Sequence, residues 1–259
     1  MSGTEPGRDG GDTEPSFLSH LIELRERLLK AVAAILIILV GLLPFSDRLY
    51  HLIAEPLLQR LPHGSQMIAI EVASPFITPV KLAFVSAVFL AMPIVLYQLW
   101  RFVAPGLYRH EQRLAMPLLA SSVVMFYLGC LFAYFLVLPR VFSFLIGVTP
   151  AGVAMMTDIN RYLSFVLTLL FAFGISFEVP IVVLLLAALG WVTPEQLVRQ
   201  RRYVILIVFV LAAIMTPPDV FSMLMLAIPM CLLYELGVLA ARMFLRSSQA
   251  GVHSGDDGT

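Results

Sequence analysis

The chain alternates between long apolar runs and short polar connections. Four apolar runs approach or exceed the length of about 20 helical residues that crosses the hydrocarbon core of a bilayer. They are residues 28–45, 80–99, 114–138 and 162–189. A fifth apolar region, 203–240, is interrupted at Thr216-Pro217-Pro218-Asp219. Because two prolines and an acid cannot continue a lipid-exposed helix without leaving backbone groups unpaired, the pattern predicts a turn there and six transmembrane helices in all.

The last two of these helices are predicted to be short. The apolar part before the turn, 203–215, has 13 residues, about 20 Å at the helical rise of 1.5 Å per residue. A re-entrant hairpin and a short span in a locally thinned bilayer both fit this length, and both return the C-terminus to the same side. The predicted organisation is a disordered cytoplasmic tail (1–16), one six-helix domain (17–246) and a second disordered cytoplasmic tail (247–259).

Composition supports an all-α membrane protein. Of 259 residues, 59% are hydrophobic and 13% are charged, whereas an ordinary soluble domain is about 25% charged. The formal net charge is zero, so no global basic field points to nucleic acid.

Lysine and arginine are distributed unevenly between the two sets of connections. Twelve of the 17 lie in one set, which includes both termini and the connections 101–113 and 193–202, and five lie in the other. The positive-inside rule therefore predicts that both termini and these two connections are cytoplasmic.

The two longest outer connections are expected to contain partial helices. In 46–78, leucine and isoleucine recur at helical spacing around Pro56, which indicates a short kinked helix lying at the interface. The connection 139–161 contains Pro150, Gly152 and Asp158 and is expected to be a loop with a partial helix.

No motif in the chain indicates catalysis. There is no glycine-rich phosphate loop, His-Glu-x-x-His, Cys-x-x-Cys or Gly-x-Ser-x-Gly, and the five histidines are scattered. We therefore expect neither an enzyme, nor a cofactor, nor a metal site.

Glu178 is the carboxylate nearest the middle of a long apolar run. An ionisable group at that depth costs about 2.5–3.5 kcal/mol on insertion scales, and by default it indicates function. The structural alternative is a protonated, hydrogen-bonded acid at a kink made by Gly174 and Pro180. Glu235, near the end of the last helix, is interpreted as a structural residue beside Arg242, while Lys81 and Arg140 are expected to snorkel.

Two acids are expected at the cytoplasmic surface. Glu111 lies in the connection 101–113 among three arginines, with Phe102 and Tyr108 nearby. Glu23 lies in 17–29, which taken alone is an amphipathic entry helix. Together the two acids would suit a ligand with paired arginines and a nearby hydrophobic residue.

Several stretches resemble the TatC family, the polytopic core of the twin-arginine protein translocase. The resemblance covers about 17–245 and rests on five stretches taken together. They are His20-Leu21-Ile22-Glu23-Leu24-Arg25, Ala73-Ser74-Pro75-Phe76, Phe102-Val103-Ala104-Pro105-Gly106-Leu107-Tyr108-Arg109-His110-Glu111, Ser176-Phe177-Glu178-Val179-Pro180 and Thr216-Pro217-Pro218-Asp219-Val220-Phe221-Ser222.

The resemblance implies a role for each matching position. It implies a multi-pass protein of the bacterial plasma (inner) membrane that binds the twin-arginine signal peptide of folded preproteins. Partners would be TatA-like and TatB-like single-span proteins, in a complex driven by the proton-motive force. The implied signal-peptide site is Glu23, Arg25, Phe102 and Glu111, with Glu178 as the intramembrane acid and Pro56 and Asp219 as outer-face positions.

One position departs from the family pattern. Met223 stands where a glutamine would offer a polar contact to a partner helix, and Thr216 remains as a polar candidate. The competing function class is a small-molecule or ion transporter, which predicts converging mid-membrane polar groups and repeat symmetry. A passive scaffold for other membrane proteins is the third interpretation.

Overall fold

The structure is a computed structural model that describes residues 17–58, 68–103, 115–150, 156–216 and 220–253. Side chains are described in these ranges except at 17–20, 53–58, 115 and 244–253. The described residues are helical apart from turns and one isolated parallel bridge, Ile68 to Asp158. The elements are α1 (Phe17–Leu42), η1 (Leu43–Phe45), α2 (Ser46–Leu58), α3 (Ser74–Val103), α4 (Ala115–Phe132), η4 (Ala133–Val137), α5 (Leu138–Val148), α6 (Ile159–Ala188), α7 (Pro194–Met215) and α8 (Val220–His253).

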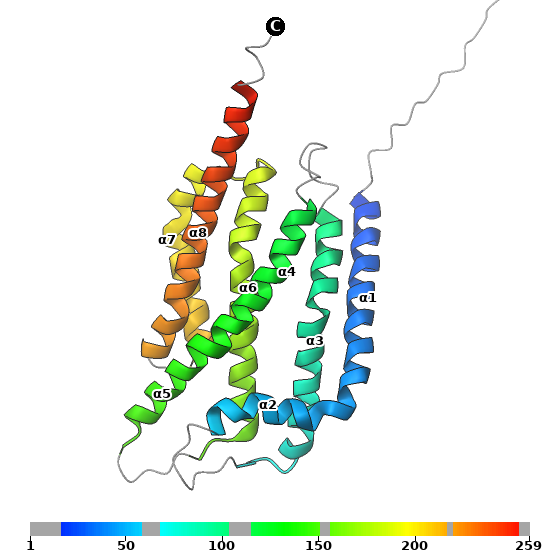
Figure 1. Ribbon diagram of the computed structural model, residues 1–259, viewed down its shortest axis with the longest axis vertical. Coiled ribbons are helices and arrows are strands. Elements are labelled where there is room, and N and C mark those ends of the chain that lie inside the picture. The colour runs from blue at the N-terminus through cyan, green and yellow to red at the C-terminus, as the bar shows by residue number, and fades with distance from the viewer. Residues whose placement is uncertain (1–16, 59–67, 104–114, 151–155, 217–219, 254–259) are drawn as a thin grey trace, which may run out of the picture.

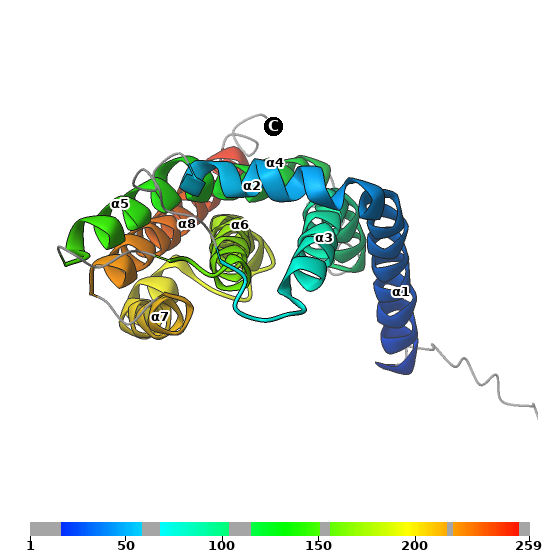
Figure 2. The ribbon, with the colours of Figure 1, turned by 90° about the horizontal axis from the view of Figure 1, so that it is seen from below.

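The helices form two layers. In one layer α1, α3, α6 and α7 stand side by side, and the second layer contains α4, α5 and α8 (Figures 1 and 2). The first residues of α1 and the last residues of α8 lie at the same end of the molecule, while α2 crosses the other end (Figure 1). The predicted all-α membrane fold is confirmed, since five segments among the described residues are long and apolar enough to span a membrane and α7 adds a sixth helix.

The main core surrounds α6, because α6 packs against α4 on one side and α8 on the other. Phe126 and Phe173 are fully buried. Two glycines allow α4 and α6 to approach closely. A Cβ at Gly129 would lie 2.5 Å from the Phe173 carbonyl oxygen, and one at Gly174 would lie 2.6 Å from the Phe126 ring. Small residues at helix contacts are typical of membrane proteins, where close van der Waals packing drives association.

The third span is longer than the sequence pattern indicated. The run expected to end at Leu138 continues through η4, a π-helical turn, and α5 to Val148. The connection 139–161, expected to be a loop with a partial helix, therefore begins with a helix that continues the third span. The wider π turn accommodates Pro139, and the Arg140 guanidinium donates to the Leu136 carbonyl oxygen at 2.9 Å, which pairs a backbone acceptor in this irregular segment.

The connection between the first two spans contains a short helix, as expected, and its position at the membrane interface stays a prediction. α2 has 13 residues and includes Pro56, whose side chain lies outside the described residues. The following span begins at Ser74, six residues before the apolar run that predicted it.

Helix α7 begins well before its apolar part. Thr193 and Gln196 form a capping box around Pro194, so the arginine-rich connection becomes the first half of a 22-residue helix. α8 has 34 residues and includes the first part of the predicted C-terminal tail. The shortness of the last two spans within the bilayer stays a prediction.

Candidate functional site

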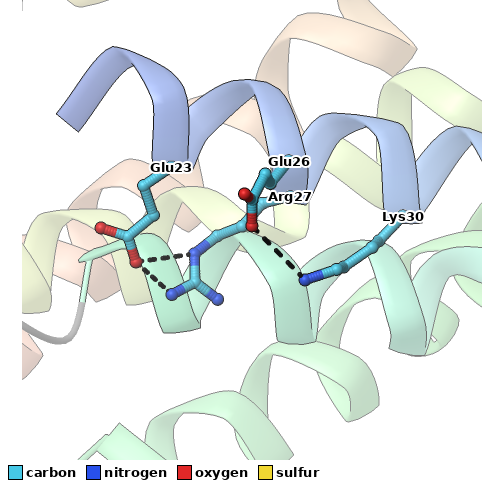
Figure 3. A network of polar contacts seen from close by, with 4 residues as sticks. All are labelled: Glu23, Glu26, Arg27 and Lys30. Atoms are coloured by element: carbon cyan, nitrogen blue, oxygen red, sulfur yellow. Dashed lines mark hydrogen bonds and ion pairs between the residues drawn. The ribbon is translucent and has the colours of Figure 1, made fainter. Parts of the chain in front are cut away.

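The first turns of α1 carry a row of paired charges (Figure 3). Arg27 donates from Nε and Nη2 to Oε1 of Glu23, one helical turn earlier. Further along the helix, Lys30 Nζ lies 3.9 Å from Oε2 of Glu26. The Arg27 side chain is only 14% exposed and that of Glu23 is 36% exposed, whereas Glu26 and Lys30 are 65% and 61% exposed. Of the two pairs, the Glu23 pair is therefore the more shielded from solvent.

The residues predicted for one site come from three parts of the chain. Glu23 and Arg25 lie in the first turns of α1, and Arg25 is exposed. Phe102 lies in the last turn of α3 and is half-buried. Because α1 packs along α3 and the start of α1 lies beside the end of α3 (Figure 1), these residues share one end of the molecule. Glu111 lies outside the described residues.

Glu178 is half-buried and lies beside two buried polar side chains, Trp100 and Ser122, between α3, α4 and α6. The Trp100 indole N–H donates to the Ser122 hydroxyl at 3.1 Å, and the Ser122 hydroxyl lies near the Glu178 carboxyl. Oε1 of Glu178 is buried and has no hydrogen-bond partner among the described residues. An unpaired buried polar atom is costly, and the role of Glu178 as the intramembrane acid stays a prediction. The sequence showed no signal for Trp100 or Ser122, because both lie within apolar patterns.

The predicted contacts at the turn between α7 and α8 are oriented inward. The Thr216 hydroxyl is buried and donates to the Ala212 carbonyl oxygen at 2.8 Å. Met223 is half-buried and packs against the main core. Asp219, the predicted outer-face residue between them, lies outside the described residues.

Glu235 pairs across the two last helices. Its Oε2 accepts from Arg201 Nη2 of α7 at 2.6 Å, and Arg242, beside which Glu235 was expected to lie, lines the same pocket as both residues. The antiparallel packing of α7 and α8 brings the two residues to the same level. The sequence alone could not distinguish Arg201 from Arg199 and Arg202.

Among the residues that the structure describes, no group of three or more histidine, cysteine, aspartate or glutamate side chains could hold a metal ion. Cys130 and Cys231 are both free thiols.

Known proteins resemble this chain over most of its length. The family described as Sec-independent protein translocase protein (TatC) matches residues 19–229. The TatC protein of Halothiobacillus neapolitanus is 53% identical over 234 residues, which are 90% of this chain but 64% of that protein. The TatC protein of Escherichia coli K12 is 50% identical over 234 residues, 90% of each chain.

A solved structure agrees with the same assignment. The crystal structure of the twin arginine translocase receptor TatC superposes with a TM-score of 0.80 at 40% identity, covering 86% of this chain and 98% of that one. A second structure of TatC, determined in DDM, gives the same TM-score and identity. The chain therefore belongs to the TatC family and is a multi-pass membrane subunit of the twin-arginine translocase.

Proposed function

We propose that this protein binds the twin-arginine signal peptide of folded preproteins at the end of the molecule where α1 begins and α3 ends. The observation that carries the proposal is the contact between Glu23 and Arg27, in which a carboxylate at this surface already holds a guanidinium. The solved relative is described as a receptor, and the same role is proposed here.

Two carboxylates would each take one arginine of the ligand. Glu23 is half-buried on α1, and Glu111 follows in the connection between α3 and α4. A planar guanidinium matches a carboxylate with two parallel donors, whereas a lysine ammonium offers a point charge. The geometry would therefore favour arginine over lysine at both positions.

The apolar part of the signal peptide would contact exposed apolar side chains of α1. Leu21, Ile22 and Leu28 of α1 are 44%, 61% and 61% exposed. Phe102, half-buried at the end of α3, would pack against the hydrophobic residue after the arginines, and Arg25 completes the proposed site. Burial of apolar surface would add affinity without selecting a sequence.

The proposed setting is the bacterial inner membrane with both termini in the cytoplasm. This orientation rests on the twelve-to-five distribution of lysine and arginine. There the protein would nucleate an export complex with TatA-like and TatB-like single-span proteins, driven by the proton-motive force. Thr216 and Met223 are the proposed partner-helix contacts, and Pro56 and Asp219 are the proposed outer-face functional positions.

Equilibrium binding of a twin-arginine peptide to the purified full chain tests the proposal. Glu23→Gln and Glu111→Gln are each expected to weaken binding about tenfold or more, because a charge-assisted hydrogen bond contributes about 1.5–3 kcal/mol. Glu26→Gln is the matched control, since Glu26 lies on the same helix turn, is more exposed, and is expected to retain wild-type affinity. Wild-type affinity in Glu111→Gln would reject the proposed site.

A further inference from the structure

A cavity of about 330 Å³ lies between α3 and α6, beginning near the first turns of both helices. It is lined by Lys81, Phe84, Val85, Val88, Ser164, Leu167, Thr168, Phe171 and Met215. The volume is within the range of about 300–1,000 Å³ that is typical of small-molecule sites. Phe84 and Phe171 are 47% and 38% exposed, so the cavity is accessible from outside the helix bundle.

The lining is polar at one end and mostly apolar along the rest. α3 and α6 both begin at the end crossed by α2 and run in the same direction (Figure 1). On α3 the residues that follow Lys81 at i+3, i+4 and i+7 are Phe84, Val85 and Val88. On α6 the residues that follow Ser164 at the same spacing are Leu167, Thr168 and Phe171. The two helices therefore present matching stripes whose polar ends lie together.

At the polar end of the cavity, the Lys81 ammonium has more hydrogen-bond donors than its contacts within the described residues use. Its Nζ donates to the Ser164 hydroxyl at 2.6 Å, and that hydroxyl donates to the Asn160 carbonyl oxygen at 2.6 Å. An ammonium carries three donors, and no ion pair of Lys81 with a carboxylate occurs within the described ranges. The carboxylate of Asp158, which caps the start of α6, accepts from the backbone N–H groups of Arg161 and Ile70.

Lys81 is expected to lie near the boundary between lipid headgroups and acyl chains, because it is close to the start of a membrane-spanning helix. It lies seven residues into α3, about 10 Å along the helix axis from Ser74, and it is the second residue of the apolar run 80–99 that predicts the span. Arg161, one turn before Ser164, adds a second exposed cation at the same end. We infer that this cavity binds an anionic phospholipid, with its phosphate on Lys81 and one acyl chain between the α3 and α6 stripes.

Charge complementarity decides in favour of a lipid over an apolar partner helix. An apolar partner helix would leave the Lys81 ammonium without an anion. A phospholipid would place its phosphate at the polar end of the cavity and its acyl chain along the apolar part. The inference does not depend on the proposed signal-peptide site, which lies at the other end of the molecule.

Native mass spectrometry of the full chain, released from detergent with phosphatidylglycerol or phosphatidylethanolamine added, tests the inference. The wild type is expected to retain one phosphatidylglycerol and to prefer it about fivefold over phosphatidylethanolamine. Lys81→Gln is expected to lose that preference. Lys81→Arg keeps the charge and is expected to retain it. Val88→Phe fills the apolar part without touching Lys81 and is expected to weaken retention of the lipid.

The chain has one other lysine, Lys30, which lies midway along α1 and does not line the cavity, and Lys30→Gln is the matched control. Equal losses in Lys30→Gln and Lys81→Gln would overturn the inference in favour of general surface charge. Two further outcomes would overturn the inference, because each would mean that the acyl chain is not bound. One is that Val88→Phe retains as much lipid as the wild type. The other is that inorganic phosphate, at the same concentration as the lipid, displaces the lipid. Displacement by an uncharged transmembrane peptide, with no effect of Lys81→Gln, would indicate a partner helix instead.

Discussion

At the scale of single residues, the contact between Glu23 and Arg27 has a functional consequence. Arg27 occupies the carboxylate that is proposed to bind an arginine of the signal peptide, so the two guanidiniums compete. Arg27→Gln is expected to raise the affinity for a twin-arginine peptide severalfold, measured by equilibrium binding. Lys30→Gln, which removes the partner of Glu26 one turn away, is expected to change nothing. A lower affinity in Arg27→Gln would mean that Arg27 positions Glu23 and does not compete with the ligand.

Glu178 is the second residue whose role can be tested by itself. Its Oε1 is buried without a partner among the described residues, and its carboxyl contacts Ser122. Glu178→Gln is therefore expected to reduce export of a folded substrate while leaving peptide binding at its wild-type value. Ser176→Ala, which removes a buried hydroxyl on the same helix that donates to the Ala172 carbonyl oxygen, is the control. Unaltered export in Glu178→Gln would support the structural alternative.

At the scale of helices, the approach of α4 to α6 depends on two glycines. Alanine at Gly129 or Gly174 would place a Cβ against a backbone carbonyl or a phenylalanine ring, and each is expected to cost about 1–3 kcal/mol of stability. A Cβ at Gly41 on α1 would meet nothing within 4 Å, so Gly41→Ala should not destabilise the protein. Thermal unfolding in detergent measures the difference, and equal melting temperatures for all three variants would contradict it.

The ion pair between Arg201 of α7 and Glu235 of α8 is expected to contribute little to stability in spite of its short distance. The side chains of Arg201 and Glu235 are 39% and 43% exposed, and exposed ion pairs typically contribute at most about 1 kcal/mol. A double-mutant cycle with Arg201→Gln and Glu235→Gln should therefore give a coupling energy below about 1 kcal/mol. A coupling several times larger would show that this pair holds the two helices together.

The sequence predicted helix number and class well, and helix ends less well. Apolar runs and the Thr216 to Asp219 interruption were enough for six helices, because lipid imposes a minimum length and excludes unpaired backbone. The continuation of the third span past Pro139 was not predictable, since it depends on a π turn and on the Arg140 side chain. The polar N-terminal half of α7 was also missed, because capping rather than hydropathy starts that helix.

Candidate site residues could be predicted from the sequence where the residue type itself indicates chemistry. Glu23 and Glu178 stand out as acids next to or inside apolar runs. Trp100 and Ser122 did not, because the indole and hydroxyl become a polar group only when α3 and α4 bring them together. The partner of Glu235 and the environment of Lys81 depend in the same way on which helices are neighbours.

At the scale of the whole molecule, the two ends are proposed to differ in function. The end where α1 begins and α3 ends carries the proposed signal-peptide site, and the opposite end carries the inferred lipid site between α3 and α6 (Figures 1 and 2). The open arrangement of α1, α3, α6 and α7 in one layer leaves many apolar side chains exposed, as expected for surfaces in contact with lipid and partner helices.

The most direct test of the central claim pairs each carboxylate with one arginine of the ligand. Binding of peptides with Arg-Arg, Lys-Arg and Arg-Lys would be measured for the wild type, Glu23→Gln and Glu111→Gln. We predict that the wild type discriminates against lysine at both positions and that each variant loses discrimination at one position only, a different one for each variant. Wild-type discrimination at both positions in both variants would contradict a two-carboxylate site.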